Sequence, residues 1–278
     1  MDIKSGRNWL LTEAAQLQPY SVVMFPDERN IAYFDGRSLV RASLRSYSTR
    51  RLYEIPAGFD RGGGLAISAD SRRAAFVEVA GDRSRLRLTD LRRGRTDTVI
   101  EWDGILRQPL PRPKSASLLF RAPDNTLWLV DYNGRNQRRL PLAEGRAGPA
   151  LFAGDGETLL YLNYPPDPKQ LHTLREFAVA TGEDTLIAKT SQFVAFAANR
   201  NASVFVGASG GKANPHILLL LRVSGRELTL CEHKSSDPAH ISLAFSPDSR
   251  WIFFQSDRDG KPAIYGMLVN EFVENTDD

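Results

Sequence analysis

A unit of about 43 residues repeats along this 278-residue chain and limits the folds it can adopt. The clearest copy runs from Leu243 to Tyr265: a short apolar strand, a Ser-Pro-Asp turn, an aromatic strand, an Asp-Gly turn and a third strand. Asp-Gly is a hairpin signal, and aromatic and β-branched residues favour strands. Weaker copies precede it, and first turns recur every 42 to 49 residues. They fall at Asp27, Asp70, about Pro113, Asp155, Asn199 and Asp248.

Four short strands in a repeat of this length are typical of β-propeller blades. Helical repeats can have a similar length, but here Gly, Asn and Pro punctuate short strands and no 3.6-residue pattern is sustained. The sixth copy has only three strands, and Asn8 to Glu13 is a strand-like segment without a partner. We therefore predict an all-β fold: a six-bladed β-propeller with four antiparallel strands per blade, its last blade closed by the N-terminal strand. We expect one domain over residues 1–270 and a short tail, 271–278.

Composition sets only loose limits on function. Apolar residues make up 42% and charged residues 25% of the chain, and the net charge is +3, so no nucleic-acid or membrane partner is expected. No apolar run approaches the length of a membrane span and no secretion signal is visible, so the cytoplasm is the expected location unless a signal was removed. Arginine far outnumbers lysine, which points either to an acidic ligand or to a bias among solvated surface residues. The single cysteine, Cys231, is expected to be a small core residue.

Common catalytic motifs are scarce. The chain has no Gly-rich phosphate loop, no Cys-x-x-Cys pair and no His-Glu-x-x-His. Its four histidines, His172, His216, His233 and His240, do not share metal-ligand spacing. Asp257 to Gly260 resembles the start of a calcium loop but lacks the later ligands, so we expect a hairpin turn there.

Several segments, taken in order, cover most of the chain and carry a resemblance to a known family. They are Tyr33 to Leu44, Arg51 to Gly58, Leu127 to Gly134, Asn214 to Leu219, Leu230 to Ser236, and Phe245 to Asp248 with Ser256 to Tyr265. Together they resemble the oligogalacturonate lyase family. The Ser-Pro-Asp blade motif alone is shared with TolB-type and other WD40-like repeats, whereas the ordered set is more specific. The resemblance implies a propeller enzyme that cleaves galacturonate oligomers by β-elimination, with a manganese-type ion held by histidines and a glutamine.

The chain departs from the family at the positions that carry this chemistry. Of the His-Pro-His-Pro run, His240 survives, the second histidine corresponds to Ser242, and the upstream glutamine falls at about Asp237. Another family histidine aligns with Gln192, and the arginine thought to act as base corresponds to Thr126. Further departures are Pro149-Ala150-Leu151 in place of His-Glu-Phe, Arg107 in place of a histidine, a loop shortened to Arg121 to Asn125, and six blades in place of seven.

These departures decide the expected function. β-Elimination needs a group that takes the C5 proton and a cation that stabilises the developing charge on the carboxylate. The remaining candidate metal ligands are His240, Asp237 and Gln192, although His240 also fits a loop or core-edge histidine. Arg107 and Arg121 are candidate ligand-binding residues that would hold a carboxylate without metal.

We therefore expect a propeller of lyase ancestry that is not an enzyme and needs no cofactor. It would bind an acidic oligosaccharide or a protein through its central funnel. One alternative is an active, Mn²⁺-dependent oligogalacturonate lyase with a rearranged site. Another is an interaction scaffold with TolB-like blades and no role in sugar binding.

Overall fold

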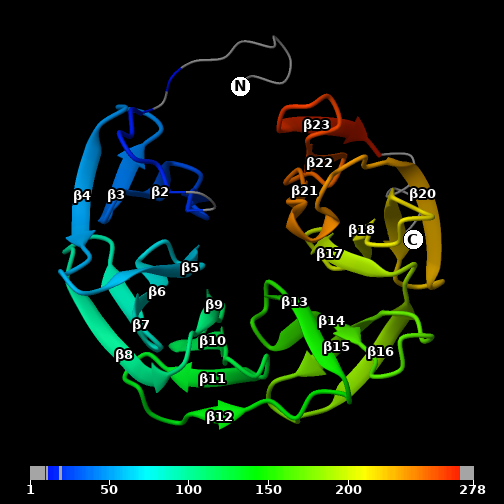
Figure 1. Ribbon diagram of the computed structural model, residues 1–278, viewed down its shortest axis with the longest axis horizontal. Coiled ribbons are helices and arrows are strands. Elements are labelled where there is room, and N and C mark those ends of the chain that lie inside the picture. Colours follow the sequence, from blue (N-terminus) through cyan, green and yellow to red (C-terminus); the bar gives the residue numbers. More distant parts are fainter. Residues whose placement is uncertain (1–9, 11, 19–20, 270–278) are drawn as a thin grey trace. The chain divides into compact units, whose positions relative to one another are not determined.

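The computed structural model describes residues 10, 12–18 and 21–269, and the chain divides into two compact units, Met1–Leu140 and Pro141–Asp278 (Figure 1). Regular structure is almost entirely β, and within the described residues the one helical element is a single 3₁₀ turn, η1 (Pro238–His240). Each unit contains three antiparallel sheets in which consecutive strands pair. The all-β, six-bladed prediction is confirmed.

Unit 1 holds three four-stranded sheets. The first contains β1 (Val23–Met24), β2 (Asn30–Asp35), β3 (Ser38–Ser43) and β4 (Thr49–Glu54). The second contains β5 (Asp60–Ile67), β6 (Arg73–Ala80), β7 (Arg83–Asp90) and β8 (Thr96–Asp103). The third contains β9 (Arg107–Pro111), β10 (Ser117–Arg121), β11 (Leu127–Asp131) and β12 (Arg138–Arg139).

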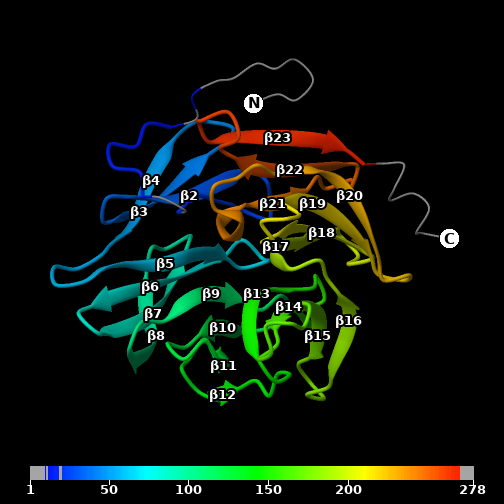
Figure 2. The ribbon, with the colours of Figure 1, turned by 45° about the vertical axis from the view of Figure 1, so that its right-hand side comes forward.

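Unit 2 holds two four-stranded sheets and one three-stranded sheet. The fourth sheet contains β13 (Arg146–Phe152), β14 (Thr158–Tyr164), β15 (Thr173–Ala178) and β16 (Asp184–Lys189). The fifth contains β17 (Phe193–Ala198), β18 (Val204–Ser209), β19 (His216–Leu221) and β20 (Arg226–Glu232). The sixth contains β21 (Leu243–Phe245), β22 (Trp251–Ser256) and β23 (Ala263–Leu268), which lie side by side (Figure 2).

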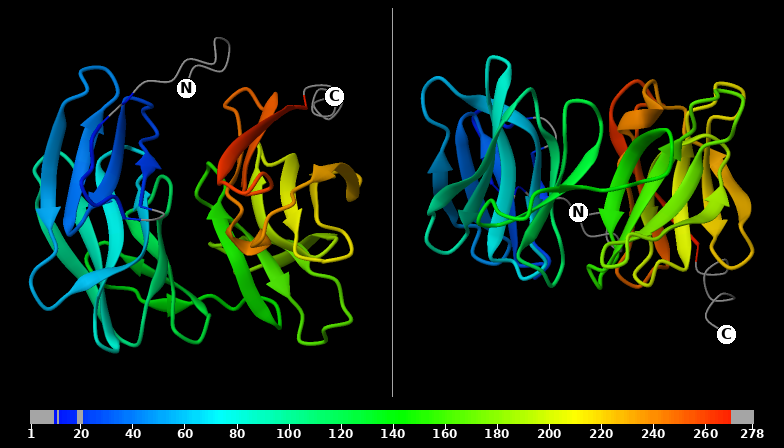
Figure 3. Two further views of the ribbon diagram at one scale, coloured as in Figure 1. Left: turned by 45° about the horizontal axis from the view of Figure 1, so that its top comes forward. Right: turned by 90° about the horizontal axis from the view of Figure 1, so that it is seen from below.

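Neighbouring sheets within a unit pack face to face, and each twists along its strands (Figure 3). The rings of Phe34 and Phe76 meet edge to face at 5.3 Å between the first and second sheets. In the fifth sheet, β19 is apolar at nearly every position because neighbouring sheets cover both of its faces. The first strands of adjacent sheets lie together: β5 contacts β9, and β17 contacts both β13 and β21. Loops at the ends of these first strands are therefore neighbours within each unit.

The turn after the first strand repeats a fixed design in five of the six sheets. A side-chain oxygen accepts the backbone N–H two residues later, and the residue between them adopts a left-handed conformation. Asp27, Asp70, Asp155, Asn201 and Asp248 supply the oxygen, at 2.8–3.1 Å. In the fifth sheet the residue in this position is Asn201, two residues beyond the Asn199 expected from the sequence.

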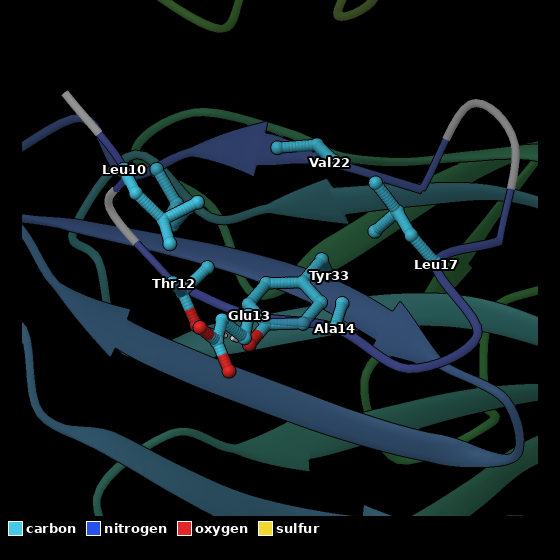
Figure 4. Close-up of a pocket in the computed structure, with 8 residues that line it drawn as sticks. Leu10, Thr12, Glu13, Ala14, Leu17, Val22 and Tyr33 are labelled. Carbon is cyan, nitrogen blue, oxygen red and sulfur yellow. Dashed lines mark hydrogen bonds between the residues drawn. The ribbon is translucent and has the colours of Figure 1, made fainter.

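Two expectations extend beyond the described residues. The segment Asn8 to Glu13, expected to complete the sixth sheet, is described only in part, so that role stays a prediction. Its described hydroxyl at Thr12 forms a 2.9 Å hydrogen bond with the Tyr33 hydroxyl in the first sheet. A groove of about 590 Å³ lies beside this sheet (Figure 4), and its lining is Leu10, Thr12, Glu13, Ala14, Leu17, Val22, Ile31 and Tyr33. The single-domain boundary at residue 270 also stays a prediction, and the tail 271–278 lies outside the described residues.

Candidate functional site

Arg107 and Arg121 are brought together in the third sheet, where they are register partners on β9 and β10. Arg107 is exposed at the first position of β9, whereas Arg121 is only 6% exposed. The Arg121 guanidinium donates to Gln108 Oε1 at 2.7 Å and to the Asn125 carbonyl at 3.1 Å. Arg121 thus links the start of β9 to the turn between β10 and β11, and Arg107 is the more accessible of the two predicted carboxylate ligands.

A second arginine stands at the equivalent end of β5. Gly64 lies against Pro109, and a Cβ at Gly64 would come within 2.7 Å of the proline Cδ, so the first strands β5 and β9 approach closely. Arg61, near the start of β5, lies over the Phe34 ring at 5.9 Å, and burial lowers the pKa of its guanidinium. Arg61 and Arg107 therefore mark the same end of two adjacent strands.

Thr126, which the sequence predicts at the position of the family's base, forms only local hydrogen bonds. Its hydroxyl donates to Asp124 Oδ1 at 2.6 Å and accepts the indole N–H of Trp128 at 2.8 Å. The Thr126 hydroxyl thus already donates one hydrogen bond and accepts another, and a hydroxyl is not basic. It is not a proton acceptor of the kind that β-elimination needs.

In unit 2 the structure brings His240 and Asp237 together on η1. The His240 Nδ1 lies 2.6 Å from Asp237 Oδ2, and the other carboxylate oxygen of Asp237 accepts the N–H of Ala239 as the cap of this turn. Both side chains are more than half exposed. The two predicted ligands therefore form an exposed pair with each other, three residues apart.

Gln192, the third predicted ligand, lies in the turn that precedes β17. Its backbone is left-handed (φ 58°), and its carbonyl accepts the N–H of Gly210 at 2.9 Å. Within the described ranges, no three His, Cys, Asp or Glu side chains lie close enough to hold a metal ion. A six-coordinate cation needs more ligand atoms than these residues supply. They offer the imidazole of His240, whose Nδ1 is already bonded, the carboxylate of Asp237 and the amide of Gln192. The three predicted ligands therefore do not form a site that fits manganese.

One cluster that was not predicted lies between the fourth and fifth sheets. We call Arg146, Tyr164 and His172 the Tyr164 cluster. The Arg146 guanidinium lies 4.9 Å from the centroid of the Tyr164 ring, and the His172 ring lies 4.3 Å from it. Arg146 is exposed, whereas Tyr164 and His172 are half-buried. The cluster thus presents a cation and an imidazole on one aromatic ring at the surface of unit 2.

The tautomer of His172 follows from its partner. Its Nδ1 lies 2.8 Å from the carbonyl oxygen of Phe193, which can only accept, so Nδ1 carries the proton and Nε2 is an acceptor in the neutral ring. Burial lowers the pKa of His172, and the nearby Arg146 charge lowers it further. This carbonyl follows Gln192 directly, so the Tyr164 cluster adjoins one of the predicted ligand positions.

Gly148 makes room for the cluster. A Cβ at this position would lie 2.6 Å from Cζ of Tyr164. The residues Pro149, Ala150 and Leu151, at the family's His-Glu-Phe positions, follow it on β13. Sequence patterns could not reveal the cluster, because the pairing of Arg146 with Tyr164 depends on a register shift between Ala147 and Ala150.

Two further reactive side chains, those of His233 and Cys231, lie in or beside the packed interior of unit 2. His233 is buried, with Nε2 3.0 Å from the Ser209 carbonyl and Nδ1 accepting the N–H of Ser235. Cys231 is half-buried beside the core of the fifth and sixth sheets, and burial raises the pKa of its thiol. The loop that begins at Asp257 is a hairpin turn, as expected. No helix in the described part of the chain is long and apolar enough to cross a membrane.

Comparison with known proteins supports the predicted resemblance. No protein-family model matches the chain. It is 22% identical to an oligogalacturonide lyase of Pectobacterium atrosepticum, over 99% of this chain and 84% of the relative. It is also 22% identical to an oligogalacturonate lyase of Dickeya dadantii, over 98% of this chain and 83% of the relative.

Solved structures support the fold. An oligogalacturonate lyase in complex with manganese superposes with a TM-score of 0.87 at 23% identity, over 95% of this chain and 80% of that one. TolB from Acinetobacter baumannii superposes with a TM-score of 0.59 at 14% identity, over 76% and 53%. The chain is therefore similar to oligogalacturonate lyases along almost its whole length and shares their fold. The alignment with the Pectobacterium lyase spans 325 residues, so that relative has residues that this shorter chain lacks.

Proposed function

We propose that this protein is a non-catalytic propeller that binds acidic oligosaccharides of the uronate type. The observation that carries the proposal is the Tyr164 cluster, in which Arg146 and a neutral His172 flank one tyrosine ring. An exposed arginine grips a sugar carboxylate through two parallel hydrogen bonds. The Nε2 of His172 is suited to accept a sugar hydroxyl.

The same residues give no support to turnover. Thr126, which we predict at the family's base position, has a hydroxyl that is already bonded on both sides. The retained His240 is paired with Asp237, and β13 offers no ionisable side chain at Pro149, Ala150 or Leu151. We therefore expect these residues to bind a uronate without supplying the base and the metal ion that β-elimination uses.

An active lyase is the second candidate, because the similarity to two named lyases extends over nearly all of the chain. In that reading Mn²⁺ would have to be held by a set of ligands different from the family's. Three expectations from the sequence stay predictions. They are a protein partner, ligand binding by Arg107 and Arg121, and a cytoplasmic location.

The test is isothermal titration with digalacturonate and trigalacturonate, with and without Mn²⁺, while the absorbance of an unsaturated uronate product is followed. Arg146→Gln is expected to weaken binding about tenfold, the loss expected for one charge-assisted contact. Arg226→Gln is the matched control, because Arg226 is an exposed arginine at the start of β20.

Three results are informative. Binding that is independent of Mn²⁺, lost in Arg146→Gln and kept in Arg226→Gln supports the proposal. Formation of unsaturated product that disappears in His240→Ala would overturn it in favour of the lyase. Absence of binding to either oligomer would also overturn it.

A further inference from the structure

The turn after the first strand of the third sheet breaks the design of the other five. The Arg112 N–H bonds the Ser117 carbonyl as the Ser68 N–H bonds the Arg73 carbonyl in the second sheet, so Lys114 is equivalent to Asp70. Lys114 is itself left-handed (φ 54°), whereas in the other five turns the left-handed residue follows the closing Asp or Asn. A lysine therefore occupies the position where the other turns have a carboxylate or an amide, two residues after Arg112.

This turn forms one wall of a pocket of about 300 Å³ within unit 1, which we call the turn pocket. The equivalent turn of the second sheet forms the opposite wall, and Tyr132, just after β11, contributes its ring. The lining residues are Ser68, Ala69, Asp70, Arg73, Arg112, Lys114, Ser115, Ala116 and Tyr132. The pocket lies at the far end of β9 from Arg107, so it is separate from the residues considered above.

Cations dominate the turn pocket. Arg73, Arg112 and Lys114 face a single carboxylate, that of Asp70. Asp70 is engaged by its own turn, accepting the Ser68 hydroxyl at 2.6 Å and the N–H of Arg72 at 3.0 Å. Among the described residues, neither Arg73 nor Lys114 has a carboxylate within ion-pair distance. The lining therefore carries two positive charges in excess.

The pocket also has a fixed shape and neutral donors. The Arg73 guanidinium lies over the Tyr132 ring at 5.1 Å, which holds both side chains in place. Burial raises the pKa of Tyr132 to about 12, and the Asp70 charge adds to this effect, so its hydroxyl stays protonated at neutral pH. Ser115 adds a hydroxyl to the lining, whereas the Ser68 hydroxyl is already donated to Asp70.

We infer that the turn pocket is a second ligand site that binds a small dianion of the phosphate type. Three cations and neutral O–H donors match a tetrahedral oxyanion, whose several oxygens each accept hydrogen bonds. A monocarboxylate would neutralise only half of the excess charge and leave donors without a partner. The inference does not depend on uronate binding at the Tyr164 cluster.

The experiment measures phosphate binding to the intact protein. Thermal unfolding is followed at increasing inorganic phosphate, with the ionic strength held constant by NaCl, and affinity is measured by titration calorimetry. Lys114→Asn removes one cation at a left-handed position that asparagine tolerates. It should weaken phosphate binding about fivefold, as expected for one exposed ionic contact. The double variant Arg112→Gln, Lys114→Asn should show no stabilisation by phosphate.

The controls separate this site from other effects. Arg250→Gln removes an exposed cation from the equivalent turn of the sixth sheet and should leave the phosphate response unchanged. The unfolding midpoint of Arg146→Gln should rise with phosphate as that of the wild type does, even if the protein does not bind uronates. Galacturonate at the same ionic strength should stabilise the protein less than phosphate does.

Two outcomes would overturn the inference. One is an unfolding midpoint of the wild type that does not rise with phosphate at constant ionic strength. The other is a rise of equal size in the double variant, since phosphate would then bind elsewhere.

Discussion

Removal of Glu78 is expected to destabilise unit 1 more than any surface change. Its side chain, on β6, is fully buried. Glu78 Oε2 lies 2.5 Å from Arg85 Nε and 3.5 Å from Arg87 Nε, and Oε1 accepts the Tyr53 hydroxyl at 2.7 Å. The side chains of Arg85 and Arg87 are only 15% and 10% exposed. In Glu78→Ala both guanidinium groups would remain buried without their shared carboxylate.

The magnitude follows from that geometry. Breaking a buried ion pair by removing one partner costs about 3–5 kcal/mol, because the remaining charge is left uncompensated. Glu78→Ala also removes the acceptor of the Tyr53 hydroxyl. Because this hydrogen bond belongs to the same network as the ion pairs, its loss adds less to the destabilisation than the loss of an independent hydrogen bond would. Glu78→Ala should therefore lower the free energy of unfolding by about 3–5 kcal/mol. Glu78→Gln keeps the shape and an acceptor, so its loss should be smaller.

Urea unfolding measures the free energy of unfolding of each variant, and variants are compared with the wild type at constant m-value. Glu101→Ala is the matched control: Glu101 lies on β8 of the same sheet, is mostly exposed, and is 4.0 Å from Arg83. It should change the free energy of unfolding by less than about 0.5 kcal/mol. A loss below about 1 kcal/mol in Glu78→Ala, or one equal to that of the control, would refute the reasoning.

Three further predictions follow from unit 2. Because burial lowers the pKa of His172, the unfolded chain binds the proton at a higher pH than the folded chain does. The free energy of unfolding should therefore fall as the pH drops from about 6.5, the pKa of an unfolded histidine, to the lowered pKa of the folded state. The urea midpoint of His172→Gln should fall less over this range than that of the wild type. Gly148→Ala should displace Tyr164 and weaken calorimetric binding of trigalacturonate, while Gly154→Ala, in an open turn, should not. Gly207→Ala should cost more than about 2 kcal/mol in urea unfolding, because a Cβ there would lie 2.0 Å from the ring of Phe193.

The sequence predicted the fold because strand and turn signals are local. The Asp-Gly and Ser-Pro-Asp turns and the alternation in β22 fix strand positions without knowledge of their neighbours. The ionic cluster was not predictable in this way. In the sequence, Glu78 is a single charged residue within an apolar strand. Only the pairing of β6 with β7 shows that Arg85 lies opposite it. The Tyr164 cluster likewise needs both a register shift and a stacking contact with His172.

The turn pocket invites a substitution that the protein itself supplies as a control. In the other five turns an Asp or Asn at the position equivalent to Lys114 closes the turn through a backbone N–H, so Lys114→Asp should be accommodated. Aspartate tolerates a left-handed backbone better than most residues, so the turn should keep its geometry, and the main difference is a negative charge in place of a positive one. Because Lys114 is exposed, stability should change by less than about 1 kcal/mol. The phosphate-induced rise in the unfolding midpoint should fall sharply. If the variant is stable and its phosphate response is unchanged, the charge of this turn is incidental and the pocket is not an anion site.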